Sequence, residues 1–99
     1  MILSVVAASV RAGRKVTFKA RGKSMEPRIK NNEIVTVAPI TEAPRKGDIV
    51  LASVNGRWYL HLVTAARQGQ VQIGNNHGHV NGWTAVENVV GVLQKRKEN

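Results

Sequence analysis

The sequence has no cysteine and few aromatic residues. The lack of cysteine excludes a disulfide framework, a thiol nucleophile and thiolate metal ligands. Aromatic residues make up 4% of the chain, so a core has to be built mainly from Val, Ile, Leu and Ala. The apolar fraction of 42% is enough for one such core, and 99 residues are too few for two comfortable ones. We therefore expect one globular domain over residues 1–99.

Acidic residues are scarce as well. Six of them stand against fifteen lysines and arginines, which gives a formal net charge of +9. Eight of the basic residues lie between positions 11 and 30. A basic surface can keep a protein in solution or bind an acidic partner, so the charge permits nucleic-acid binding without favouring it.

Long apolar runs are absent too. The start of the chain, MILSVVAASV, is largely apolar over ten residues, whereas a bilayer-spanning helix needs about 20. Its charges follow the apolar run, while a secretory signal carries them before it. We expect no membrane span and a cytoplasmic protein. His77 and His79 stand at His-x-His spacing without a nearby carboxylate, and no cofactor motif occurs, so we expect neither metal nor cofactor.

The first thirteen residues have a helical pattern. Ile2, Val5, Val6 and either Ser9 or Val10 recur at helical spacing, which predicts an amphipathic helix with these side chains on one face. Gly13 is placed to end this helix.

Residues 16–94 have the pattern of a β domain, with short apolar runs separated by turn residues. Asn55-Gly56 predicts a two-residue hairpin, GDIVLASV predicts a strand covered on both faces, and NNHGHVNGW predicts a loop. The fold class is therefore a compact, mainly β domain, a partly closed barrel-like structure or a sandwich, with one short N-terminal helix. The predicted strands are 16–20, 33–39, 47–54, 57–65, 70–74 and 88–94.

Ser24 lies in an unusual setting, since Gly22 precedes it and Pro27 follows it. It could be a turn residue or a nucleophile, and a nucleophilic serine needs a base within hydrogen-bond reach. His61 lies in the middle of a predicted strand, a rigid position that suits a catalytic base. The alternative is a hydrogen-bonded structural histidine on the sheet surface.

The order of motifs resembles a known superfamily. The segments RGKSMEP, NNEIVTV, KGDIVLA, YLHLV, IGNN and VVGVL resemble, in this order, the type I signal peptidases and LexA-like self-cleaving repressors. The superfamily pattern at the nucleophile is G-x-S-M-x-P, and the resemblance extends from about Val16 to Leu93.

This resemblance implies a serine peptidase that acts on a protein or peptide. Ser24 would be the nucleophile, and His61 would take the place of the base, which is a histidine in some members. The turn formed by Gly22, Ser24 and Met25 would supply backbone N–H groups to the oxyanion, and Met25 would pack into the core behind the serine.

One departure from the superfamily pattern concerns the residue that orients the base. Where the superfamily commonly has Gly-Asp-Asn, this chain has Gly74-Asn75-Asn76, so Asn75 and Asn76 are the candidates for orienting His61 in place of an acid. Two alternatives to a peptidase remain open. One is an inactive or weakly active relative that binds an extended peptide in the same groove. The other is a basic, nucleic-acid-binding β domain.

Overall fold

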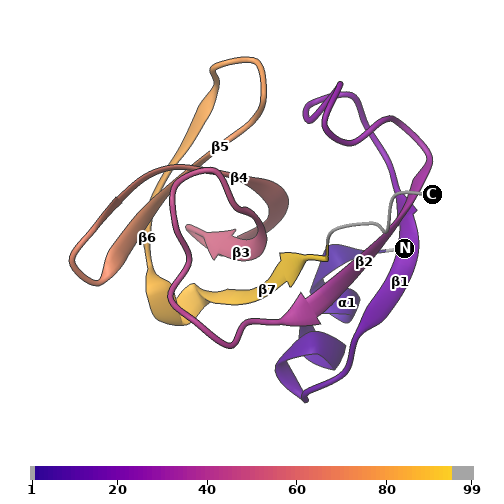
Figure 1. Ribbon diagram of the computed structural model, residues 1–99, viewed down its shortest axis with the longest axis horizontal. Helices are drawn as coiled ribbons and strands as arrows, with labels where there is room; N and C mark the ends of the chain where they lie inside the picture. The colour runs from indigo at the N-terminus through magenta and orange to yellow at the C-terminus, as the bar shows by residue number, and fades with distance from the viewer. Residues whose placement is uncertain (1, 95–99) are drawn as a thin grey trace.

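The computed structural model describes residues 2–94, in which seven antiparallel strands form one sheet (Figure 1). The sheet order is β1-β2-β7-β3-β4-β5-β6, and its end strands β1 and β6 do not pair with each other. The predicted fold class, mainly β with one short N-terminal helix, is confirmed, and the sheet is open. The elements are α1 (Leu3–Arg11), β1 (Val16–Ala20), β2 (Glu33–Pro39), β3 (Ile49–Val54), β4 (Arg57–Arg67), β5 (Gln70–Gly74), β6 (Val80–Ala85), the short 3₁₀ helix η1 (Val86–Asn88) and β7 (Val89–Leu93).

Helix α1 ends as the sequence predicts. Gly13 has a φ of 97° and donates its N–H to the Val10 carbonyl at 2.9 Å. The next residue, Arg14, donates to the Ser9 carbonyl at 3.2 Å. This pair of bonds is a Schellman motif, which satisfies carbonyls that the last helical turn leaves free. In the part of the chain that the structure describes, no helix is long and apolar enough to cross a bilayer.

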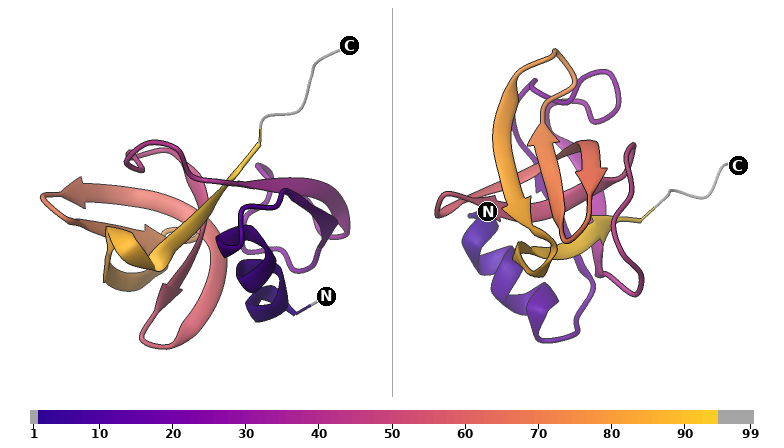
Figure 2. Two further views of the ribbon diagram at one scale, coloured as in Figure 1. Left: turned by 90° about the horizontal axis from the view of Figure 1, so that it is seen from below. Right: turned by 90° about the vertical axis from the view of Figure 1, so that its left-hand side faces the viewer.

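The apolar face of α1 differs from the prediction. The helix packs against β7, β4 and β2 through Val6, Ala7 and Val10, which are buried (Figure 2). Ile2 and Val5 are 70% and 60% exposed. Successive helical residues are turned by about 100°, so a stripe centred on Val6, Ala7 and Val10 leaves Val5 on the outside. Placing Ile2 and Val5 on the buried face was wrong.

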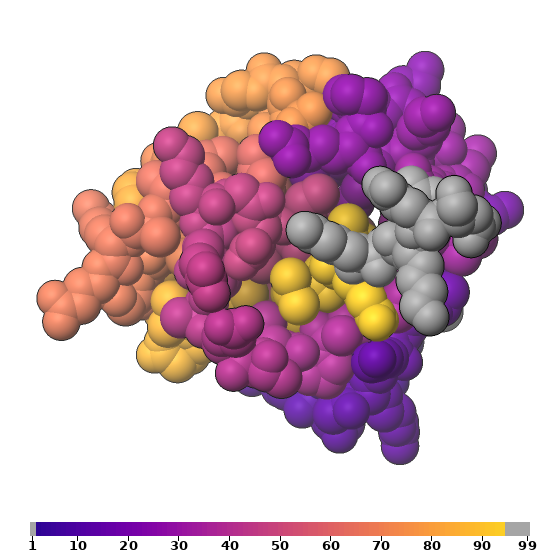
Figure 3. Space-filling view, in the orientation of Figure 1, coloured from indigo at the N-terminus to yellow at the C-terminus, as the bar shows by residue number. Residues whose placement is uncertain are grey.

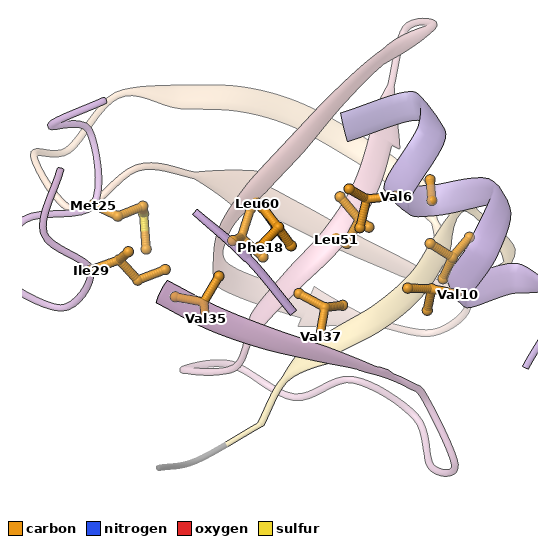
Figure 4. Packing of buried hydrophobic residues seen from close by; sticks show 11 residues of the cluster. Val6, Val10, Phe18, Met25, Ile29, Val35, Val37, Leu51 and Leu60 are labelled. Atoms are coloured by element: carbon orange, nitrogen blue, oxygen red, sulfur yellow. The ribbon is translucent and has the colours of Figure 1, made fainter. Parts of the chain in front are cut away.

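Strand β3 is covered on both faces, as its nearly continuous apolar run predicts. Leu51 lies in one hydrophobic cluster together with Val37 and residues of α1 (Figure 4). Its neighbours Val50 and Ala52 lie in a second cluster on the opposite face. All three side chains are fully buried, so the strand separates two cores.

The Asn55-Gly56 hairpin is confirmed. Both residues have positive φ, 51° and 81°, and the strands on either side pair from Val54 with Arg57 onward. Positive φ at both central positions is the geometry that favours Asn-Gly in two-residue hairpins.

Strand β6 is the strand that the sequence does not predict. Residues 80–83 fall in the predicted loop, but they belong to a strand that pairs with β5 from Gly74–Val80 to Gln70–Ala85. Asn and Gly have low intrinsic strand preference, and here tertiary pairing outweighs it. The buried Thr84 adds a bond from its hydroxyl to the Ser53 carbonyl at 2.8 Å. This strand carries Asn81 into the sheet.

The close packing around Gly91 predicts that a larger residue at this position lowers the stability of the fold. A Cβ there would lie 2.6 Å from Val37 Cγ1 and 2.9 Å from Val10 Cγ1. Both distances are shorter than the van der Waals contact between two carbon atoms. Gly91→Ala is therefore expected to lower the free energy of unfolding by about 2 kcal/mol, measured by urea denaturation. Val37→Ala removes the nearest contact, so the double variant should lose less than the sum of the two single losses. Strict additivity would contradict the proposed clash.

Candidate active site

Ser24 lies in the loop between β1 and β2, residues 21–32, which is called the serine loop. Buried apolar side chains hold this loop on the sheet. Met25 and Ile29 are buried and point toward Phe18 and Leu60 in the first core (Figure 4). The Ile29 N–H also donates to the Met25 carbonyl at 3.0 Å. Ser24, directly before the buried Met25, is half-buried at the surface of that core. The predicted packing of Met25 behind the serine is confirmed.

A second loop, residues 75–79 between β5 and β6, holds the serine loop from the other side. Asn76 donates its N–H to the Ser24 carbonyl at 3.0 Å and its Nδ2 to the Glu26 carbonyl at 2.9 Å. Its Oδ1 accepts a bond from Arg28 Nε at 2.7 Å. The two loops meet along the top of the molecule in Figure 3. Asn76 thus holds the serine loop through three bonds, two to backbone carbonyls and one to the side chain of Arg28.

The loop 75–79 is itself organised by Asn75. Its Oδ1 accepts the backbone N–H groups of His77, at 2.8 Å, and His79, at 3.0 Å. The ring Nε2 of His77 bonds the Lys23 carbonyl at 3.0 Å, which adds a further link to the serine loop. Asn75 and Asn76, the residues expected to orient the base, therefore shape these two loops, and neither hydrogen-bonds His61.

The structure brings Ser24 and His61 together. His61 lies in β4, half-buried, and its Nε2 is 3.1 Å from Ser24 Oγ. The Tyr59 ring, from the same face of β4, lies beside the imidazole with the ring centroids 5.1 Å apart. Two residues 37 positions apart in the chain thus share a hydrogen bond. A hydroxyl bonded to an imidazole is the arrangement that activates a serine for acyl transfer.

The partner of the second imidazole nitrogen is Asn81. Its Oδ1 lies 2.7 Å from His61 Nδ1. An amide oxygen can only accept, so Nδ1 carries the proton and the lone pair of Nε2 faces the Ser24 hydroxyl. Sequence reasoning missed Asn81 because its segment was interpreted as a loop. The signal that could have revealed it is the strand-forming composition of Val80, Trp83 and Thr84 around it.

The environment of His61 keeps its imidazole neutral. Burial lowers the pKa of His61 below its ordinary value, since the half-buried ring loses hydration of its charged form. The hydrogen bond to Asn81 acts in the opposite direction, and the nearby His79 lowers the pKa further. The net shift is downward. At neutral pH His61 is therefore unprotonated and can accept a proton.

A cleft of about 160 Å³ adjoins Ser24 and His61. Three of its lining residues, Lys19, Arg21 and Gly22, are exposed, and they form what is called the rim of the cleft. Its remaining lining is mostly apolar and comes from α1, β1, the serine loop and β4. These residues are Leu3, Phe18, Ala20, Met25, Ile29, Trp58, Tyr59 and Leu60.

The three residues of the predicted oxyanion turn differ in their available donors. Gly22 donates its N–H to Asn31 Oδ1 at 2.9 Å, so this group is already engaged. Within residues 2–94, the N–H groups of Ser24 and Met25 have no acceptor. Apart from Gly22 and its two chain neighbours, no heavy atom of the described residues lies within 4 Å of the position that a Cβ would take at Gly22, which leaves room for a chain beside it.

The mainly β fold and the Ser24–His61 pair agree with the resemblance of the sequence to the LexA-like and signal-peptidase-like domains. A model of the family described as Peptidase S24-like matches residues 3–86, and the chain belongs to this family. The resemblance in the sequence is thereby confirmed. No curated protein and no solved structure matched the chain in the corresponding searches. Membership indicates a serine-peptidase or LexA-like function.

Proposed function

We propose that the protein is a serine endopeptidase in which Ser24 is the nucleophile and His61 the general base. The observation that carries this proposal is the 3.1 Å bond between Ser24 Oγ and His61 Nε2, with Nδ1 held by Asn81 at 2.7 Å. Asn81 occupies the position of the third, orienting member of a catalytic triad. An amide in this place fixes the tautomer and the orientation of the ring without adding a charge.

The reaction is an acyl transfer in two halves. Ser24 Oγ attacks the carbonyl carbon of the scissile bond while His61 Nε2 takes the hydroxyl proton. The imidazolium then returns this proton to the leaving amine as the C–N bond breaks, which leaves an acyl ester on Ser24. Water, deprotonated by the same Nε2, hydrolyses the ester and restores the hydroxyl.

The oxyanion of each tetrahedral intermediate is stabilised by backbone donors in the serine loop. The N–H groups of Ser24 and Met25 are the candidates, because the N–H of Gly22 is engaged by Asn31. A donor of this kind contributes about 3 kcal/mol to transition-state stabilisation. The buried Met25 and the bonds of Asn76 hold the loop, so the donors need no reorganisation during the reaction.

The cleft supports a preference for an apolar side chain next to the scissile bond. Its volume of about 160 Å³ is close to that of an apolar cavity known to hold benzene. A side chain the size of leucine, methionine or phenylalanine fills such a space and buries apolar surface against Phe18, Met25 and Leu60.

The test is digestion of a mixed peptide library, with products identified by mass spectrometry. Wild-type protein should cut at bonds next to leucine, methionine or phenylalanine, and the products should be missing with Ser24→Ala. A wild-type product set identical to that of Ser24→Ala would overturn the peptidase proposal. Peptides retained by both proteins without cleavage would instead support an inactive, peptide-binding relative.

A further inference from the structure

The rim of the cleft carries positive charge without acidic partners. Lys19 and Arg21 line the cleft, and Lys23 directly precedes the serine. All three are exposed, and within residues 2–94 none of them forms an ion pair. Residues 19–33 contain five basic residues against two acidic ones. An anionic group bound beside the cleft would therefore lie near cations that form no ion pair with the described residues.

The two acidic residues of this segment have other roles. Glu26 is half-buried and accepts the N–H of Asn31 at 3.3 Å. Glu33 is also half-buried and accepts the N–H of Lys30 at 3.0 Å. Both carboxylates thus help to shape the loop between β1 and β2. The excess of positive charge at the mouth of the cleft remains.

We propose that the substrate is an acidic segment, with aspartate or glutamate within about four positions of the scissile bond on at least one side. An extended peptide advances about 3.3 Å per residue, so side chains at this separation reach the rim while an apolar side chain occupies the cleft. Opposite charges at a rim raise the association rate and favour an acidic peptide over a neutral or basic one. This inference rests on the proposed peptidase function and names its substrate class.

The experiment measures binding apart from cleavage. Ser24→Ala protein is titrated into fluorescein-labelled peptides with a central leucine flanked by aspartate, by asparagine or by lysine, and anisotropy is recorded. The aspartate peptide should bind about tenfold more tightly than the asparagine peptide at about 50 mM salt. The difference should shrink at about 500 mM salt, and the lysine peptide should bind most weakly.

A matched pair of charge reversals locates the effect. Arg21→Glu, added to Ser24→Ala, should reduce the ratio between the affinities for the aspartate and asparagine peptides by about threefold or more. Lys46→Glu changes the charge by the same amount at an exposed residue that does not line this cleft, and it should leave the preference in place. Equal losses in the two variants, or equal binding of all three peptides at low salt, would overturn the inference.

Two further outcomes are distinguishable. Single-stranded DNA that displaces the aspartate peptide at lower concentrations than the unlabelled peptide does would assign the rim to nucleic acid and overturn the inference. Selective binding of the aspartate peptide by Ser24→Ala, with no cleavage by the wild type, would support the acidic ligand and contradict the peptidase function.

Discussion

Alanine in place of Ser24, of His61 or of both is expected to lower kcat/KM for peptide cleavage by the same factor, about 10⁵-fold. The reason is that the two residues act as one unit. Without Nε2 the hydroxyl keeps its proton, and without the hydroxyl the imidazole has nothing to activate. The residual rate would come from the oxyanion donors and from binding alone. Single-turnover kinetics on a peptide that the wild type cleaves would measure the three losses.

The matched control is His79→Gln, which replaces an exposed histidine on the neighbouring loop. Its ring acts on His61 only by lowering the pKa of that imidazole, so at a pH above this pKa kcat/KM should change by about threefold at most. Thermal denaturation of every variant checks that the fold is retained. Multiplicative losses in the double variant, or a His61→Ala protein as active as His79→Gln, would contradict the dyad.

The second prediction concerns Asn81, the orienting amide. Asn81→Ala should lower kcat/KM by about 10²-fold, because a freely rotating imidazole spends little time aligned with Ser24 Oγ. Loss of activity alone does not separate positioning from damage to β6. The pH profile does, since it reports the ionisation of His61 itself.

The sign of the pH effect follows from the state that reacts. The neutral imidazole is the active form, so wild-type kcat/KM should rise with pH and level off above the pKa of His61. Since burial lowers this pKa, the midpoint of the acid limb should lie below about 6.5. In Asn81→Asp, a carboxylate beside the ring favours the imidazolium and raises the pKa of His61, which moves the acid limb to higher pH. An acid limb that is identical in Asn81→Asp and wild type would contradict the positioning role.

Much of the fold could be predicted because its signals are local. The apolar run around Val50 predicts a doubly covered strand, Asn55-Gly56 predicts the hairpin, and Gly13 predicts the helix end. The face of α1 could not be assigned from spacing alone, since several valines compete for it. The elements that pack against the helix select the stripe centred on Val6 and Val10.

Part of the candidate site was also predictable. Ser24 and His61 were selected from a motif and from the order of strands, and the structure places their side chains 3.1 Å apart. Their catalytic roles stay a prediction. The prediction that Asn75 or Asn76 orients His61 was wrong, because their side chains bond the backbone of the two loops and the side chain of Arg28.

Composition, local pattern and motif were sufficient to predict the class of fold, to select Ser24 and His61, and to show the excess of positive charge. The partner of His61 was decided by the tertiary structure alone. Asn81 comes from a segment whose Asn and Gly residues favour a loop, and only pairing with β5 makes it a strand beside the base. Strand pairing is a contact between two separate parts of the chain. Its energy depends on both parts together, so it cannot be inferred from the local sequence of either one. For this reason the residue that holds His61 in the absence of an acid became visible only in the folded protein.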